Sequence, residues 1–140
     1  MVFIGVDFGD KRVGIAKSDG VLATAVCSLC VDGISDAAAK VALQISSLGG
    51  SEVIIGLPKN MDSSEGPRAR RTRRFGEKLK QLTGIDPIYF DERLTTAQAY
   101  VYMNETDFKS KKRKSVIDAL SAKIILQGYL DQKRSAPPVI

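Results

Sequence analysis

The sequence has 140 residues, with 21 Lys and Arg, 16 Asp and Glu, two Cys and no His. A chain of this length usually forms one domain, with a core that needs no disulfide or structural metal. The absence of His excludes Ser-His-Asp and Cys-His catalysis and His-ligated zinc, so acid–base chemistry falls to carboxylates, Lys, Tyr, Cys or metal-bound water. The net charge of +5 favours a polyanionic partner, above all nucleic acid, although an aromatic content of 6% makes an extended base-stacking platform improbable.

The first third of the chain predicts three short strands and a helix. Residues 2–9 are apolar on both faces, which is typical of a buried central strand. Residues 13–19 and 21–29 follow after tight turns, which indicates an antiparallel meander. Residues 33–48 then change to a helical period, and Gly49 ends that helix.

The rest of the chain alternates strands with helices. The predicted elements are a strand over 52–58, a basic helix over 67–83, a strand over 87–92, a helix opened by Thr95 or Thr96, and a last helix over 115–130. Strands that alternate with helices imply parallel crossovers, so the order is βββαβαβαα. This order predicts an α/β fold of ribonuclease-H-like architecture, with a mixed five-stranded sheet and helices on both faces. We expect one domain over residues 1–131 and a flexible tail over 132–140.

Cys27 and Cys30 have the C-x-x-C spacing of a redox pair or of half a metal site. They lie in an apolar run without a second pair, and their context indicates the end of a strand. We therefore interpret them as two small apolar residues in a reducing compartment. The N-terminus lacks the basic region of a signal peptide, and no apolar run approaches the length of a membrane span. We expect a cytoplasmic protein without membrane contact.

Asp7 stands in the middle of the first strand, where an unpaired buried charge is costly and must be compensated. Gly5 and Gly9 flank it at period two, which predicts an open backbone face that a ligand can approach. We therefore interpret Asp7 as part of a metal or phosphate site. The alternative is a structural salt bridge or a carboxylate at a strand end.

Asp91 and Glu92 end an apolar strand, and sites in α/β sheets gather at the carboxyl ends of strands. Because side chains alternate along a strand, we expect only one of these two acids to reach Asp7 directly. Arg93 could pair with either acid or with a phosphate. The alternative is an ordinary exposed loop triplet.

Asp118 lies in the last predicted helix and borders an apolar stripe that Ala122 and Ile125 continue. The small residues around it suit a helix packed closely against a metal site. The alternative is a carboxylate in the first helical turn, about three residues into the predicted helix, where the helix dipole favours it.

Together, Asp7, Glu92 and Asp118 predict a site with oxygen ligands only, which selects Mg²⁺ or Mn²⁺ over zinc. Two such ions, roughly 4 Å apart, can activate a water and stabilise the leaving oxygen of a phosphodiester without any histidine. We expect Asp7 to bridge both ions while each of the other two acids completes one. Asp91 and Arg93 would then orient ligands or the phosphate.

Two basic runs and the polar loop after the fourth strand supply candidate phosphate contacts. Charge runs are most often solvated surface, but two runs that flank an acidic site favour nucleic-acid binding, which would weaken steeply with salt. The candidates for nucleic-acid binding are Lys59, Asn60, Arg68, Arg70, Arg71, Arg74, Lys111, Lys112, Arg113 and Lys114.

Four segments of the chain resemble the YqgF (RuvX) family in order and spacing: GVDFGDKRVGIAKSD, IIGLPKNMDSSEGPRA, FDERLTT and KRKSVIDALSAKIILQGYL. The resemblance runs from Ile4 to Leu130. It implies a ribonuclease-H-like fold of a bacterial family whose catalytic acids correspond here to Asp7, Glu92 and Asp118.

Members of this family are described as nucleases for the 5′ end of pre-16S ribosomal RNA and as Holliday junction resolvases. RuvC-like sites often carry a fourth acid one turn beyond the third, where this chain has Ser121 and Ala122, so junction cleavage is the less favoured function. We expect a two-metal endonuclease acting on structured RNA, or else on branched DNA, as a monomer or weak homodimer. The alternatives are a non-catalytic RNA-binding assembly factor and, from the likeness of DFGDKRVG to a phosphate loop, an actin-like ATPase or sugar kinase.

Overall fold

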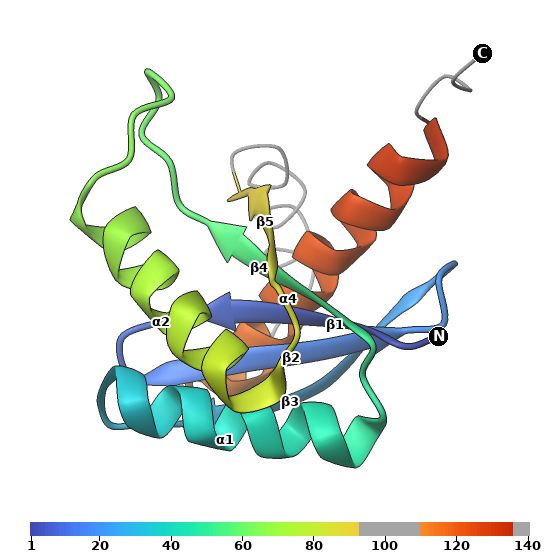
Figure 1. Cartoon of the computed structure of the whole chain (residues 1–140), viewed down its shortest axis with the longest axis horizontal. Helices are drawn as coiled ribbons and strands as arrows, with labels where there is room; N and C mark the ends of the chain where they lie inside the picture. The colour runs from blue at the N-terminus through green and yellow to red at the C-terminus, as the bar shows by residue number, and fades with distance from the viewer. Residues whose placement is uncertain (93–109, 136–140) are drawn as a thin grey trace.

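A computed structural model describes residues 1–92 and 110–135 of the chain, except for the side chains of 110–116 and 135. The elements in chain order are β1 (Phe3–Phe8), β2 (Arg12–Ser18), β3 (Ala23–Cys30), α1 (Gly33–Leu48), β4 (Glu52–Leu57), α2 (Pro67–Thr83), β5 (Ile88–Asp91) and α4 (Ser110–Ser135) (Figure 1). The helix that we expect after Thr95 or Thr96 lies outside the described residues.

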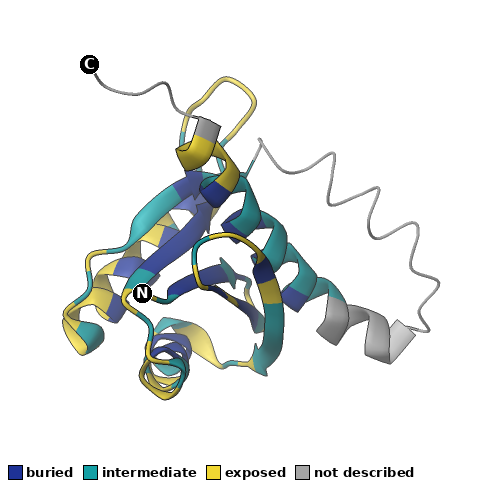
Figure 2. Ribbon diagram, turned by 90° about the vertical axis from the view of Figure 1, so that its right-hand side faces the viewer, coloured by how far each residue is buried: buried dark blue, intermediate teal, exposed yellow. Residues whose placement is uncertain are grey.

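The five strands form one mixed sheet in the order β3-β2-β1-β4-β5. The first three strands pair antiparallel, whereas β4 and β5 run parallel to β1. Helices α1 and α2 cover one face and α4 covers the other, and buried residues concentrate between these layers (Figures 1 and 2). The predicted five-stranded sheet with helices on both faces is confirmed.

The face under α1 and α2 carries the larger core. Ala37, Val41 and Ile45 form the inward stripe of α1, each separated by one helical turn. From α2, the ring of Phe75 stacks on that of Phe8 at a centroid distance of 4.4 Å. Leu43 and Leu82 are exposed, because they lie off the stripes that face the sheet.

The face under α4 is lined by small residues. A Cβ atom on Gly5 would lie only 2.7 Å from Cβ of Leu126, and one on Gly14 would clash with the carbonyl oxygen of Asp118. The expectation that Gly5 and Gly9 leave a face open for a ligand is therefore wrong. The space at Gly5 admits helix α4, and Gly9 belongs to the turn in which its N–H donates to the carbonyl of Arg12.

The last helix is longer than expected at both ends. It begins at Ser110 rather than at residue 115, so the basic run 111–114 lies in a helix and not in a loop. It continues through Ser135, so residues 132–135 belong to the helix rather than to a tail. The expected ends of the two earlier helices are confirmed, since Gly49 and Gly84 both adopt the left-handed conformation, with φ of 69° and 73°.

Cys27 and Cys30 lie in β3 as free thiols. Burial raises the pKa of the Cys27 thiol, which keeps it protonated and unreactive. The raised pKa at Cys27 favours its interpretation as a small apolar residue, whereas Cys30 is exposed at the end of β3. Over residues 1–92 and 110–135, the helices are too short or too polar to cross a lipid bilayer.

Candidate active site

The parallel strands β1, β4 and β5 bring their carboxyl ends to one end of the sheet. Asp7 is the penultimate residue of β1, and Glu92 directly follows β5. Side chains alternate along each strand, so Asp7 shares a face with Phe3, and Glu92 shares a face with Phe90. Phe3 and Phe90 both belong to the core under α4, which places the two acids on that same face.

Glu92 reaches Asp7 across the intervening strand β4. A Cβ atom on Gly56 of β4 would lie 2.6 Å from Oε1 of Glu92 and 2.5 Å from a methyl carbon of Ile125. Because Gly56 has no side chain, the side chain of Glu92 can pass over β4 at this position. A side-chain hydrogen bond then joins Glu92 to Asp7. We expect only one acid of the Asp91–Glu92 pair to reach Asp7, and that acid is Glu92.

The contact between Asp7 and Glu92 shifts both carboxyl groups. Burial, followed by the charges of Glu92 and Asp118, raises the pKa of Asp7 to about 7. Burial also raises the pKa of Glu92, and the neighbouring charge of Asp91 adds to this shift. Two carboxyl groups at hydrogen-bond distance cannot both ionise cheaply, so near neutral pH the pair holds a proton between them.

Asp118 comes from helix α4 and is held on its other side. The Nε–H of Arg12 donates to Oδ2 of Asp118 at 2.8 Å, and the hydroxyl of Ser28 donates to the same oxygen at 3.1 Å. Asp118 lies well inside α4 and directly over Gly14, so the alternative of a carboxylate in the first helical turn is wrong. Its charge acts on Asp7, whose pKa it raises.

The donor set fits a hard divalent cation in part. Asp7 and Glu92 are half-buried carboxyl groups joined by a hydrogen bond, and a cation that takes oxygen ligands would compete with the proton they share. In the described part of the chain, however, no three acidic, Cys or His side chains already converge as a metal cage. Asp118 is the member that stands apart, because Arg12 and Ser28 engage its Oδ2.

The remaining residues predicted around the acids have different positions. Asp91 ends β5 and acts electrostatically on Glu92. Arg68, in the first turn of α2, lowers the pKa of both Asp7 and Glu92 through its positive charge, so it lies close enough to act on this pair. Arg93 lies outside the described residues.

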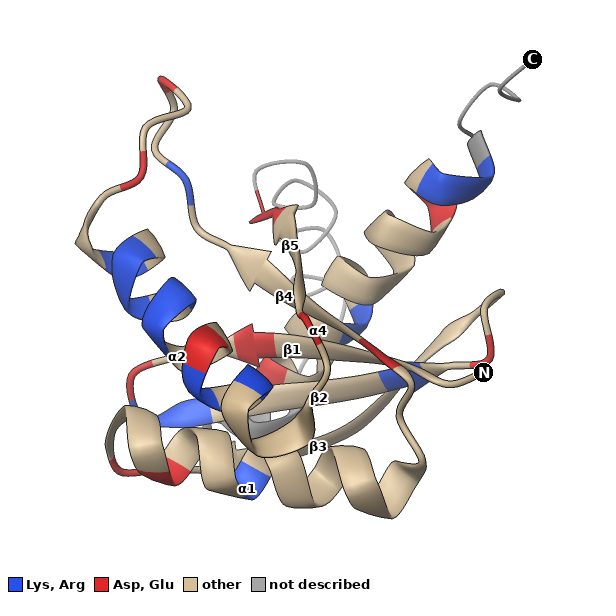
Figure 3. Ribbon diagram, viewed as in Figure 1, with Lys and Arg blue, Asp and Glu red and all other residues tan. Residues whose placement is uncertain are grey.

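Helix α2, which carries the other arginines, packs on the face of the sheet opposite α4 (Figure 3). Arg71 lies 3.6 Å from a carboxylate oxygen of Asp10 and packs over the ring of Phe8. Arg70 donates to the backbone carbonyl of Glu65 at 3.3 Å, and Arg74 is exposed. These side chains form a basic surface beside the acid site rather than a wall of it.

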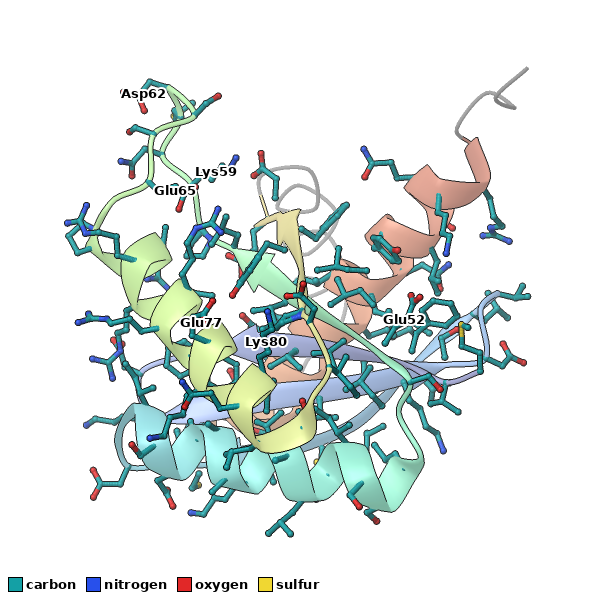
Figure 4. The ribbon with its side chains drawn as sticks, in the orientation of Figure 1. Glu52, Lys59, Asp62, Glu65, Glu77 and Lys80 are labelled. Atoms are coloured by element: carbon teal, nitrogen blue, oxygen red, sulfur yellow. The ribbon has the colours of Figure 1, made fainter. Side chains whose placement is uncertain are left out.

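The loop between β4 and α2 rises beyond the carboxyl ends of the strands, with Asp62 at its tip and Lys59 and Glu65 at its base (Figure 4). Lys59 is half-buried there. The side chain of Asn60 donates to the hydroxyl of Ser64 at 3.0 Å, so Asn60 holds the turn of this loop. The side chains of Lys111, Lys112, Arg113 and Lys114 lie outside the described residues.

Four further residues contact the acids in the structure but are not predicted from the sequence: Arg12, Gly14, Ser28 and Gly56. Gly56 carries a usable signal, since a glycine inside an apolar strand often marks a close approach of another group. The others depend on register. Asp7 pairs with Gly14 and Gly14 pairs with Ser28, an arrangement that only the assembled sheet establishes.

The architecture also occurs in solved structures. The structure of T. thermophilus RuvC in complex with Holliday junction substrate superposes with a TM-score of 0.62 at 14% identity, over 99% of each chain. A second T. thermophilus RuvC structure gives a TM-score of 0.56 at 13% identity, over 99% of this chain and 100% of the other. The fold is therefore that of the RuvC-like, ribonuclease-H-like α/β proteins.

Within that class, the family model described as "RuvX: Holliday junction resolvase" matches residues 1–132, and this chain belongs to the RuvX family. A relative from Limosilactobacillus fermentum is 42% identical over 136 residues, which cover 94% of each chain. A relative from Ruminiclostridium cellulolyticum is 38% identical over 135 residues, covering 94% of this chain and 95% of the relative. Both relatives carry the name "Putative pre-16S rRNA nuclease". The resemblance found in the sequence is confirmed.

Proposed function

We propose that the protein is a metal-dependent endonuclease that hydrolyses phosphodiester bonds of structured RNA, with pre-16S ribosomal RNA as its substrate. The observation that carries this proposal is the half-buried, hydrogen-bonded Asp7–Glu92 pair at the carboxyl ends of β1 and β5. Two carboxyl groups held this close are costly to ionise together, and a divalent cation bound between them would remove that cost. The names of the relatives supply the substrate.

Asp7 and Glu92 would hold the cation, and Asp118 would join them from α4. Bound Mg²⁺ or Mn²⁺, as one ion or two, would supply the Lewis acidity that activates water and stabilises the leaving oxygen of the phosphodiester. The protein positions these carboxylates on rigid elements, and burial under α4 strengthens every charge interaction among them.

The basic residues would hold the RNA backbone. Arg68 lies at the edge of the acid site, where it could contact the phosphate next to the scissile bond. Arg70, Arg71 and Arg74 would contact phosphates further along α2, and Lys59 would contact them from the loop. This division predicts that Arg68 affects cleavage and that the other arginines affect mainly affinity and its dependence on salt.

The test is a cleavage assay on precursor 16S RNA with Mg²⁺ or Mn²⁺, comparing wild type with Asp7→Asn. We expect Asp7→Asn to lose at least a hundredfold in rate while RNA affinity stays within a few-fold, because the charge that holds the cation is gone. Asp86→Asn is the matched control, since Asp86 is an exposed acid at the opposite end of β5. Cleavage by Asp7→Asn at the wild-type rate would overturn the proposal.

Holliday junction resolution is a second candidate, because the matching family model is described by that activity. Symmetric cleavage of a four-way DNA junction requires two sites related by a two-fold axis, and hence a dimer. The same assay with a four-way junction, together with sedimentation of the free protein, separates the two candidates. Paired cuts by a dimer favour junction DNA, and a single cut in RNA by a monomer favours pre-16S RNA. Metal-dependent RNA binding without cleavage of either substrate would instead indicate a non-catalytic assembly factor.

A further inference from the structure

The carboxylate of Asp118 sits over a row of residues that crosses three strands. Asp7 of β1 pairs with Gly14 of β2, and Gly14 pairs with Ser28 of β3. Directly opposed residues of antiparallel strands point to the same face of the sheet. Helix α4 rests on Gly14 at the backbone carbonyl of Asp118; the Asp118 carboxylate accepts a hydrogen bond from Ser28, and its charge acts on Asp7.

Both hydrogen bonds that the structure shows to this carboxylate reach the same oxygen. Arg12 donates to Oδ2 through Nε, and Ser28 donates to Oδ2 through its hydroxyl. Arg12 precedes Gly14 by two positions in β2 and so lies on the same face. The donors from β2 and β3 therefore hold Oδ2, and among the described residues no hydrogen bond engages Oδ1.

This arrangement has the form of an outer shell around a metal ligand. Carboxylates that bind metal ions are usually held by hydrogen bonds from neighbouring side chains, which set their orientation before the ion arrives. We propose that Arg12 and Ser28 are positioning residues that hold Oδ2 of Asp118 and so direct Oδ1 toward the Asp7–Glu92 pair as a further ligand for a divalent cation. The inference rests on the proposed function, and neither residue has a part in that function as stated above.

The opposing explanation is an ion pair that merely anchors α4 to the sheet. The side chains of Arg12 and Asp118 are 36% and 25% exposed, and ion pairs with this degree of solvent contact add little to stability. Helix α4 is already anchored by fully buried side chains such as Ala122 and Leu126. A role in orienting Asp118 accounts for the convergence of two donors on one oxygen, which anchoring alone does not require.

The test measures Mn²⁺ affinity of the full chain by calorimetry, without substrate. Ser28→Ala removes one donor without changing charge, and we expect about tenfold weaker Mn²⁺ binding with an unchanged midpoint of urea unfolding. Ser28→Thr, which keeps the hydroxyl, should restore most of the affinity. Arg12→Gln should weaken Mn²⁺ binding by roughly ten- to a hundredfold. Lys11→Gln is its control, because it removes a positive charge from the same turn without contacting Asp118.

Each outcome bears on one claim. Wild-type or tighter Mn²⁺ binding by Ser28→Ala would overturn the positioning role, and tighter binding would show that the two donors compete with the cation. If Arg12→Gln and Lys11→Gln weaken Mn²⁺ binding equally, Arg12 acts only through its charge, and the inference is overturned. If Asp7→Asn binds Mn²⁺ as wild type does, the proposed function fails, and the inference fails with it.

Discussion

The two faces of the sheet are built from different kinds of side chain. Under α1 and α2, large apolar residues fill the space, with the stacked rings of Phe8 and Phe75 near the carboxyl end of β1. Under α4, the strands present Gly5, Gly14 and Gly56 to the helix, and the acids gather where those glycines leave room. Large apolar side chains on one face stabilise the sheet, and the glycines on the other face leave room for carboxylates from separate elements to meet. Changes on the first face should therefore alter stability, and changes on the second should alter chemistry.

The largest effect on stability is expected from Phe75→Ala. Phe75 is fully buried, and its loss removes the stacked partner of Phe8 and leaves a cavity, so the free energy of unfolding should fall by about 3–5 kcal/mol. Urea denaturation measures this change, with Leu43→Ala on the exposed side of α1 as a control that should stay near wild type. The folded fraction should bind Mn²⁺ normally. A large loss of Mn²⁺ affinity would show that the two faces are coupled.

Gly14→Ala should combine a smaller loss of stability with a loss of chemistry. The added methyl group would collide with the backbone of Asp118, and overpacking of this kind costs about 1–3 kcal/mol. Relief of the clash displaces Asp118, so Mn²⁺ affinity and cleavage should both fall. Gly5→Ala is the matched comparison, since its methyl group meets Leu126 instead. Equal losses of Mn²⁺ affinity in both variants would contradict the local role of Gly14.

Asp7→Asn should stabilise the metal-free protein in a manner that depends on pH. Folding raises the pKa of Asp7 from 3.8 to about 7, so the folded state disfavours its ionised form. The contribution of this group to stability is thus fully present below pH 4 and is lost as the pH rises through 7. Asn cannot ionise, so the variant should gain on the order of 4 kcal/mol over wild type at pH 8 and little at pH 4. Unfolding curves at both values, without metal, check this, and an advantage independent of pH would contradict it.

Arg68→Gln should give the smallest effect. Its charge lowers the pKa of Asp7 and of Glu92, so its removal should raise both pKa values a little further. Carboxyl chemical shifts followed by NMR across pH 4–9 on a metal-free sample measure the change. Arg74→Gln, on the same helix and exposed, should leave the titration unchanged. An equal shift in both variants would mean that Arg68 acts through net charge alone.

Much of the fold and part of the candidate site could be predicted from the sequence. Apolar runs, glycine caps and alternating elements were enough to predict the five strands and two of the helices, and an acid inside an apolar strand singled out Asp7. The choice between Asp91 and Glu92 depends on Gly56, a residue of another strand, so no local pattern decides it. The donors Arg12 and Ser28 depend likewise on the register between strands.

The errors have identifiable physical reasons. The predicted last helix begins at residue 115 and leaves the basic run 111–114 outside it. Lys and Arg are good helix formers, and α4 begins before this run, at Ser110. Gly5 reads as room for a ligand, whereas a helix from the far end of the chain occupies that room.

The passage of Glu92 over Gly56 also bears on when the site can form. The meander of β1, β2 and β3 is local in sequence and closes only short turns, whereas β4 and β5 join through long crossovers that form more slowly. Glu92 follows a strand of four residues at the edge of the sheet, and it meets Asp7 only after that strand has paired with β4. A chain still emerging from synthesis, or one whose edge strand has opened, therefore lacks the assembled acid pair on which the proposed hydrolysis depends.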